Sequence, residues 1–443
     1  MKIGLAMSIL KTIIKSSSAW AIADQVIASA GNFATALVLA RGLPTAEFGV
    51  FVLINSACLI GIGLHGNLII SPLVVLGVSG DRDRSRIYPT VALMFTLAML
   101  PAVALVVLPA SQLLHRGATG ILALIYVLAW QFQETMRRTL ISRRRYRDAM
   151  WGDGFSYVGQ AMIVALLFQR PGMTLNLAFL VMAATSLAAA TLQGWQLKLV
   201  SASLSELRKY AFEFWVLGKW LAIVSLISLI ASPLFPWLLN WFHGKEAVAI
   251  FQATMNVFGL ANPLILSIPA IIMPAAANLL SGSGATGRRS LIDLSMKHVL
   301  LFEGIIAPWL LLLLLWPHEV LTLIYGKASI YSGQTGMLRL GVLVCIFNIP
   351  MAVMQAALTG VRKTKSNAVM YGVGSITSLV FAPIAIFAGG VFGAMLSEAV
   401  TRGSCLLAAM RSLYAIPAIS HSLGDSADAE YEALRAQSRK GVF

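Results

Sequence analysis

Residues 90–110 read TVALMFTLAMLPAVALVVLPA, a run of 21 residues without a charged side chain. A helix needs about 20 mainly apolar residues to cross the hydrocarbon core of a bilayer. The whole chain is 58% hydrophobic and 12% charged, whereas soluble domains average roughly 45–50% and about 25%. Because a chain of 443 residues with this composition cannot cover itself with polar groups, a soluble enzyme is excluded and a membrane protein is expected.

Runs of similar length recur on both sides of this one. We expect about twelve membrane-spanning helices, because an open sheet would leave backbone groups unpaired in lipid. The predicted spans are residues 18–40, 48–70, 90–110, 119–136, 151–169, 175–194, 214–240, 248–280, 298–316, 336–358, 367–387 and 391–410. The eighth is too long for one simple span and contains Pro263, Pro269 and Pro274, so a kink or break is predicted inside it.

The positions of the basic residues predict the orientation of the spans. Loops on one side carry 25 of the 33 Lys and Arg residues, and loops on the other side carry five. Since cytoplasmic loops are enriched in these residues, both termini are expected in the cytoplasm. Lys and Arg residues in short loops between apolar runs are suited to binding lipid headgroups. Nucleic acid is therefore excluded as the partner. The basic cytoplasmic residues include Arg137, Arg138, Arg143, Arg144, Arg145, Arg147, Arg208, Lys209, Arg362, Lys363 and Lys365.

Two of the cytoplasmic loops repeat one another. Residues 143–152 (RRRYRDAMWG) align at an offset of 220 with residues 363–372 (KTKSNAVMYG), so a basic loop each time enters a helix through Met-aromatic-Gly. Because transporters are often built from two related bundles, we predict pseudo-symmetric six-helix bundles at 1–205 and 206–410, followed by a cytoplasmic tail at 411–443. The alternative is that both loops are merely basic.

Four further segments follow one another along the chain: residues 38–51 (VLARGLPTAEFGVF), 323–327 (LIYGK), 357–365 (ALTGVRKTK) and 389–394 (GGVFGA). They resemble, in the same order, the polysaccharide transporters, the O-antigen flippase branch of the multidrug/oligosaccharidyl-lipid/polysaccharide exporter superfamily. The resemblance covers about residues 18–410, although its motifs are degenerate. Peptidoglycan-precursor flippases of the same superfamily usually have fourteen helices, which argues mildly against them here.

This resemblance implies a non-enzymatic flippase of the bacterial inner membrane. Such proteins move undecaprenyl-pyrophosphate-linked oligosaccharide units for surface or exopolysaccharide synthesis, and alternating access is the expected mechanism. The expected partners are this lipid-linked substrate, membrane lipids, and polysaccharide polymerase and export proteins. Two alternatives stay open: a multidrug and toxin exporter of the same superfamily, and a membrane polysaccharide polymerase or ligase. No P-loop or zinc-protease motif occurs, so no cofactor is expected besides a coupling H⁺ or Na⁺.

Ionisable residues inside the spans are the candidate functional residues, because burying them in lipid is costly. Glu398 and Arg402 lie four residues apart, so they share a helix face and can pair. They form either a self-neutralising structural pair or a site where Arg402 binds a phosphate or an acidic sugar. Fixed cations offset the lost hydration of a diphosphate, and polar amides can line a sugar path. The remaining candidates for the substrate cavity are Arg41, Lys219, Arg339, Asn256 and Asn262.

Asp24 is the candidate for ion coupling, because it begins a polar face in the first predicted span. Burial disfavours a charged carboxylate. Asp24 therefore either takes up H⁺ or Na⁺, or anchors neighbouring helices through a hydrogen bond. Two other carboxylates, Glu134 and Glu303, lie near the cytoplasmic ends of spans and are expected to pair with neighbouring Arg137, Arg138 or Lys297.

Overall fold

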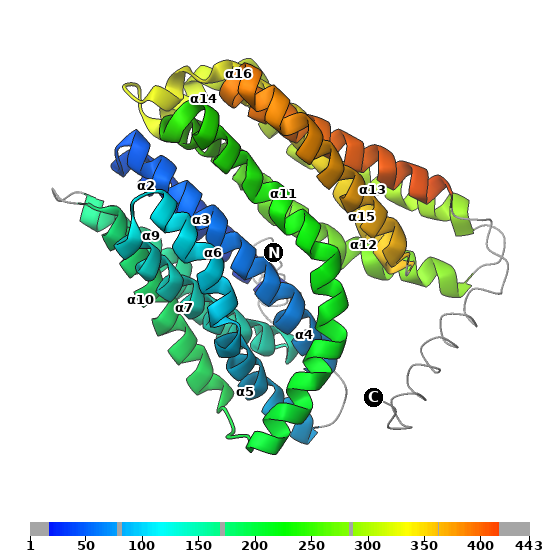
Figure 1. Cartoon of the computed structure of the whole chain (residues 1–443). Coiled ribbons are helices and arrows are strands. Elements are labelled where there is room, and N and C mark those ends of the chain that lie inside the picture. Colours follow the sequence, from blue (N-terminus) through cyan, green and yellow to red (C-terminus); the bar gives the residue numbers. More distant parts are fainter. Residues whose placement is uncertain (1–16, 78–81, 169–172, 283–286, 362, 416–443) are drawn as a thin grey trace, which may run out of the picture. The chain divides into compact units, whose positions relative to one another are not determined.

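The computed structural model describes residues 17–77, 82–168, 173–282, 287–361 and 363–415. Every regular element among these residues is helical (Figure 1). Arg362 and the predicted tail beyond residue 415 lie outside the described residues.

The N-terminal elements correspond to the first six predicted spans. They are α2 (Ser17–Gly42), α3 (Thr45–His65), η1 (Gly66–Ile70), α4 (Ser71–Gly77), α5 (Arg82–Ala98), α6 (Leu100–Leu113), α7 (Gly117–Ser142), α8 (Tyr146–Asp153), η2 (Gly154–Val158), α9 (Gly159–Phe168) and α10 (Leu175–Leu197). The predicted span 90–110 is interrupted at Met99 between α5 and α6, because Pro101 has no N–H for the helix ladder. Thr174 caps α10 by accepting a hydrogen bond from the Leu177 N–H at 3.3 Å.

Two of the C-terminal elements, α11 and α16, each consist of two helices that meet at a kink. The elements are α11 (Leu204–Phe258), η3 (Gly259–Ala261), α12 (Asn262–Gly282), α13 (Gly287–Leu315), α14 (Pro317–Tyr325), η4 (Ile330–Gly333), α15 (Thr335–Gly360) and α16 (Thr364–Tyr414). α11 breaks at Gly244 and α16 breaks at Gly390, where φ is 82° and 54° respectively. Glycine is favoured there because other residues rarely adopt positive φ.

The helices are long enough to cross a membrane repeatedly. Among the described residues, eight stretches meet the length and hydropathy of a span, and two of them include the breaks at Gly244 and Gly390. α7 is not among the eight because its polar residues lower its hydropathy, although it occupies the fourth predicted span. The break expected in the eighth span is confirmed by η3, directly before Pro263. The protein is therefore an all-helical, multi-pass membrane protein.

Packing groups the chain into two units, of which the first comprises Met1–Pro263, Leu313–Gly341 and Ser378–Ser397. Its described core contains a chain of aromatic rings. Phe51 lies between Phe48 and Phe179, with ring centroids 6.1 Å and 5.3 Å away. Within this unit α2 packs on α8 and η2, and α7 packs on α10.

The second unit comprises Leu264–Leu312, Val342–Thr377 and Glu398–Phe443. Its buried apolar residues include Phe302 and Val353. Gly360 allows a close approach, because a Cβ there would lie 2.6 Å from the backbone oxygen of Met273. The predicted division into bundles at residue 205 stays a prediction.

Candidate functional site

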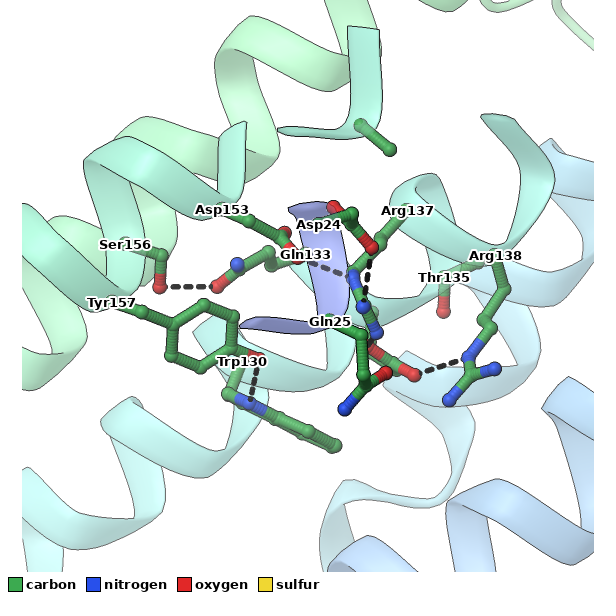
Figure 2. A network of polar contacts seen from close by, with 12 residues as sticks. Asp24, Gln25, Trp130, Gln133, Thr135, Arg137, Arg138, Asp153, Ser156 and Tyr157 are labelled. Atoms are coloured by element: carbon green, nitrogen blue, oxygen red, sulfur yellow. Dashed lines mark hydrogen bonds and ion pairs between the residues drawn. The ribbon is translucent and has the colours of Figure 1, made fainter. Parts of the chain in front are cut away.

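A buried guanidinium lies at the centre of a polar network in the first unit. Arg137 comes from α7 and is 6% exposed. Its Nε donates to Asp153 Oδ2 at 2.5 Å, and its Nη2 donates to Asp24 Oδ2 at 2.7 Å. Its Nη1 donates to Glu134 Oε2 at 3.3 Å. One side chain therefore joins carboxylates from α2, α7 and α8 (Figure 2).

The charges of this network do not balance when every group is ionised. Arg138 adds a second guanidinium, whose Nε donates to Glu134 Oε1 at 2.5 Å. Three carboxylates and two guanidiniums leave one negative charge. Asp24 Oδ1 and Asp153 Oδ1 have no hydrogen-bond donor among the described residues. Both carboxyl groups bind the same guanidinium through Oδ2, so one cation serves the two of them.

The local sequence explains how these groups meet. α7 buries several polar residues, among them Gln133, Glu134 and Thr135. Asp153 ends α8 directly before η2, a π-helical turn of five residues, and such turns often occur at functional sites. Ser156 within η2 donates to Gln133 Oε1 at 2.7 Å, which ties the turn to α7.

Glycine brings the first helix against this turn. A Cβ on Gly31 of α2 would lie 2.6 Å from the backbone carbon of Tyr157 in η2, so a larger residue would push the two elements apart. The Tyr157 hydroxyl accepts a hydrogen bond from Trp130 Nε1 at 3.3 Å. Asp24 lies on the same helix as Gly31, and its approach to Asp153 depends on this contact.

The network departs from the sequence-based expectation for its arginine. Arg137 was expected on the cytoplasmic side as one of many loop bases, but α7 continues to Ser142 and carries Arg137 inside the fold. The expected pairing of Glu134 with Arg137 and Arg138 is confirmed. Asp153 was not predicted as a site residue. A charge two residues into a predicted span is the signal that identifies it.

The second unit contains the predicted pair on α16. Arg402 donates from Nε and Nη2 to Glu398 Oε1 at 2.9 Å and 2.7 Å, so the expected i,i+4 pairing is confirmed. Its Nη1 reaches Asn348 Oδ1 of α15 at 3.5 Å. The Arg402 side chain remains 34% exposed and that of Glu398 13%.

Two other predicted cations contact backbone carbonyls. Arg41, at the end of α2, donates from Nε to Ile324 O at 2.6 Å and from Nη2 to Leu323 O at 2.9 Å. Arg339 on α15 donates from Nε to Leu314 O at 3.1 Å. Carbonyls near a helix C-terminus carry partial negative charge, and each guanidinium keeps further N–H groups for other partners.

The remaining predicted residues are dispersed. Lys219 lies on α11 and has an interaction partner of its own. Gln252 donates to Asn256 Oδ1 at 2.8 Å, while Asn262 at the start of α12 is exposed. Whether Lys219, Asn256 or Asn262 touches substrate stays a prediction.

The basic loops differ in how strongly their side chains are held. Arg145 donates to Asp148 Oδ2 at 2.6 Å and to the Gln196 carbonyl at 3.0 Å. Arg143 also has an interaction partner, and Arg144 has a positive φ of 57°. The other described basic residues of the two predicted loops are Arg147, Lys363 and Lys365.

The ion pair expected for Glu303 is not formed among the described residues. Glu303 of α13 has a buried Oε1 without a hydrogen-bond partner in the described part of the chain.

Cys58, Cys345 and Cys405 are free and buried. No group of His, Cys, Asp and Glu among the described residues is arranged to hold a metal ion.

Comparison with known proteins places this fold. No protein-family model and no curated protein matches the sequence. Solved structures do match it over most of its length. An inward-facing multidrug resistance MATE family transporter of the MOP superfamily is 14% identical, with a TM-score of 0.63, over 89% of this chain and 96% of that one.

Two further structures are similar to it. The lipid II flippase MurJ in an inward closed conformation is 10% identical, with a TM-score of 0.65, over 90% of this chain and 88% of that one. A ligand complex of the MATE multidrug transporter DinF-BH is 14% identical, with a TM-score of 0.64, over 91% and 95%. The chain thus has the all-helical membrane fold, built of two helical bundles, that these MATE and MurJ structures have.

Proposed function

We propose that this protein is a flippase for undecaprenyl-pyrophosphate-linked oligosaccharide units in a bacterial inner membrane. The substrate's lipid tail stays in the bilayer while its sugar-diphosphate head crosses by alternating access. The likeness in fold to a lipid II flippase and to MATE transporters supports the transport of a lipid or an amphipathic molecule. The resemblance of four sequence segments to polysaccharide transporters supports the oligosaccharide substrate.

The partial exposure of the Arg402 guanidinium favours an anionic substrate. Arg402 lies inside the last predicted span, yet a third of its side chain is open. A guanidinium at such a depth is tolerated where it faces water or a partner, and Glu398 engages only part of its donor set. The free donors suit a diphosphate, whose oxygens match the planar guanidinium. A drug exporter for cations would be hindered by the same charge.

Complementation of a gene deletion tests this function. The deletion is expected to accumulate single lipid-linked repeat units and to abolish the surface polymer, and the wild-type gene restores both. Arg402→Ala is expected to fail in restoration. Arg411→Ala is the matched control, because Arg411 is an exposed base in the last turn of the same helix.

The rival function predicts a different result. A multidrug exporter of the same fold would leave the glycolipids unchanged on deletion and would raise the sensitivity of the cells to cationic drugs. The MATE similarity of the fold makes this the second candidate. Unchanged glycolipids together with drug sensitivity would overturn the flippase proposal in favour of the exporter.

We further propose that transport is coupled to H⁺ through Asp24. The three carboxylates and two guanidiniums around Asp24 carry one surplus negative charge. A proton shared by Asp24 and Asp153 neutralises the network, and two neighbouring carboxylates favour such sharing. A charged network inside a membrane protein is costly, so the network favours the uptake of this proton, and the proton gradient across the membrane supplies the driving force for transport.

The geometry favours H⁺ over Na⁺ as the coupling ion. Arg137 directs its Nε, Nη1 and Nη2 at three different carboxylates. A sodium ion at the centre of these oxygens would have to displace a cation that is covalently part of the protein. A proton needs no such displacement, because Asp24 Oδ1 and Asp153 Oδ1 have no hydrogen-bond donor among the described residues and either can accept it.

Reconstituted vesicles test the coupling. Transport of a fluorescent lipid-linked sugar by wild-type protein is expected to respond to an imposed pH gradient and not to a sodium gradient of equal size. Asp24→Asn is expected to abolish the pH response, while Asp148→Asn, an Asp outside the network, retains it. A response to sodium alone would contradict this proposal and leave the flippase function intact.

A further inference from the structure

An open groove on the first unit lies where α5 and α11 pack together. It has a volume of about 540 Å³ and is lined by Phe95, Ala211, Phe212, Trp215, Arg208 and Lys209. Phe95 comes from α5, and the other five residues come from the first three turns of α11. The groove is thus apolar along most of its length and basic at one end.

A buried aromatic cluster supports two of the lining residues, because Phe95 and Ala211 pack against it. In this cluster Tyr88 of α5 packs edge-on against Tyr210 of α11 at 5.4 Å between ring centroids, and it also contacts Phe214 at 5.9 Å. The Tyr88 hydroxyl donates to Glu213 Oε2 at 3.2 Å. These contacts join α5 to α11 next to the groove.

The basic end is free of a strong carboxylate partner. Arg208 and Lys209 are exposed, and no ion pair to either is formed within the described chain. The nearest acidic side chain in the sequence, Glu206, accepts hydrogen bonds from the Ser203 N–H at 2.8 Å and hydroxyl at 2.7 Å. Lys209 Nζ lies 5.5 Å from the Tyr210 ring centroid, which places its charge beside the groove.

Spacing puts the basic and apolar parts in one line. Arg208, Ala211, Phe212 and Trp215 are three or four residues apart, so they share one face of α11. Phe212 and Trp215 are exposed on this face. Tryptophan favours the boundary between hydrocarbon and headgroups, and basic pockets between membrane helices bind anionic headgroups. The face therefore presents charge at the headgroup level and apolar surface below it.

We propose that this groove is a specific binding site for one anionic phospholipid of the cytoplasmic leaflet. The phosphate lies between Arg208 and Lys209, and an acyl chain lies along Ala211, Phe95 and Trp215. Charge complementarity selects the headgroup, and the groove selects a lipid over a free phosphate. The bound lipid is a structural ligand that joins α5 to α11, separate from the transported molecule.

Native mass spectrometry of the purified full-length protein tests this site. After delipidation, titration with phosphatidylglycerol is expected to show one tight site that phosphatidylcholine does not fill. The double variant Arg208→Gln/Lys209→Gln is expected to weaken the phosphatidylglycerol site about tenfold or more, since each base near a headgroup contributes about 1 kcal/mol. Lys363→Gln/Lys365→Gln removes the same charge from another predicted cytoplasmic loop and is expected to leave the site intact.

A second variant separates the groove from the charges. Ala211→Phe fills the groove while keeping both bases, and it is expected to weaken phosphatidylglycerol as strongly as the double variant does. Equal occupancy by phosphatidylglycerol and phosphatidylcholine would overturn the proposal, as would wild-type affinity in both groove variants. Displacement of phosphatidylglycerol by a polyprenyl diphosphate at equal concentration would also overturn it, because the site would then belong to the substrate lipid.

Discussion

Arg137 and Arg402 are the same residue type in membrane-spanning helices, but the two units use them in opposite ways. The Arg137 side chain is 7% exposed and joins carboxylates from three helical elements. The Arg402 side chain is 34% exposed, and its one carboxylate partner lies on its own helix. Arg137 therefore joins three elements in the interior of the first unit, whereas a third of the Arg402 side chain stays open to a ligand.

The difference between the two arginines shows that a charged residue inside a span is not by itself a binding site. A buried cation surrounded by carboxylates has no open face for a substrate, and its removal leaves unpaired charges behind. A partly open cation is worth little to stability and much to recognition. Substitutions at the two arginines are therefore expected to separate into effects on folding and effects on transport.

The largest expected effect is the loss of Arg137. Arg137→Leu leaves Asp24, Glu134 and Asp153 without their shared cation, and removal of one partner from a buried ion network typically costs about 3–5 kcal/mol. Thermal unfolding of the detergent-solubilised protein measures the effect as a fall in Tm and yield. Arg137→Lys is the companion variant, and it is expected to recover only part of the loss because an ammonium cannot bind three carboxylates in a planar fork. A Tm equal to that of the wild type would show that Arg137 does not stabilise the first unit.

The next effect concerns the surplus charge around Asp24. The carboxylates of this network outnumber the guanidiniums, so neutralising one carboxylate removes a repulsion between like charges. Asp24→Asn removes the surplus carboxylate charge and keeps an oxygen for Arg137 Nη2. Its Tm is expected to fall much less than that of Arg137→Leu. A loss of Tm equal to that of Arg137→Leu, with Asp148→Asn as the control, would show that the network needs the Asp24 charge.

Arg402→Ala is expected to lower the stability less than Arg137→Leu does, because it leaves one carboxylate, Glu398, without its cation, whereas Arg137→Leu leaves three. The same variant is expected to abolish complementation. Tm and surface polymer are measured on the same cultures. In Arg402→Ala the polymer is expected to be lost while the Tm falls little, whereas in Arg137→Leu both are expected to fall. A large fall in Tm would mean that Arg402 is a structural residue.

The smallest effect is expected at Arg138, which shares Glu134 with Arg137. Its side chain is 43% exposed, so Arg138→Gln is expected to lower the free energy of unfolding by less than about 1 kcal/mol. Glu134 keeps its contact with Arg137 Nη1 in this variant. A loss of stability similar to that of Arg137→Leu would show that the network depends on the total charge and not on the geometry of one guanidinium.

Hydropathy and charge were sufficient to predict the helical spans and the break before Pro263, because apolar length and proline act locally along the chain. The pairing of Glu398 with Arg402 was predictable for the same reason, since four residues of helix decide it. The association of Asp24 with Asp153 was not predictable. These residues are 129 positions apart in the sequence, and only the packing of α2 on α8 and η2 brings them together.

The buried position of Arg137 could not be predicted from the sequence, because other basic residues follow it closely. Six basic residues lie between positions 137 and 147, and a count of charges treats them as one loop. The end of α7 at Ser142 separates them, because Arg137 lies within the helix and Arg143 follows it. A helix end displaced by six residues relative to the predicted span thus moves a charge from the surface to the interior.

The π-turn Gly154–Val158 constrains how the gene can change in length. This turn holds one residue more than an α-helical turn would, and each residue of an α-helix rotates the chain by about 100°. Deletion of a single codon here would rephase α9 and carry Gln160 away from Thr35, its hydrogen-bond partner at 3.1 Å. Homologues are therefore expected to tolerate substitutions at 154–158 but not insertions or deletions, and an alignment gap at this point would mark proteins that have lost the Asp153 network.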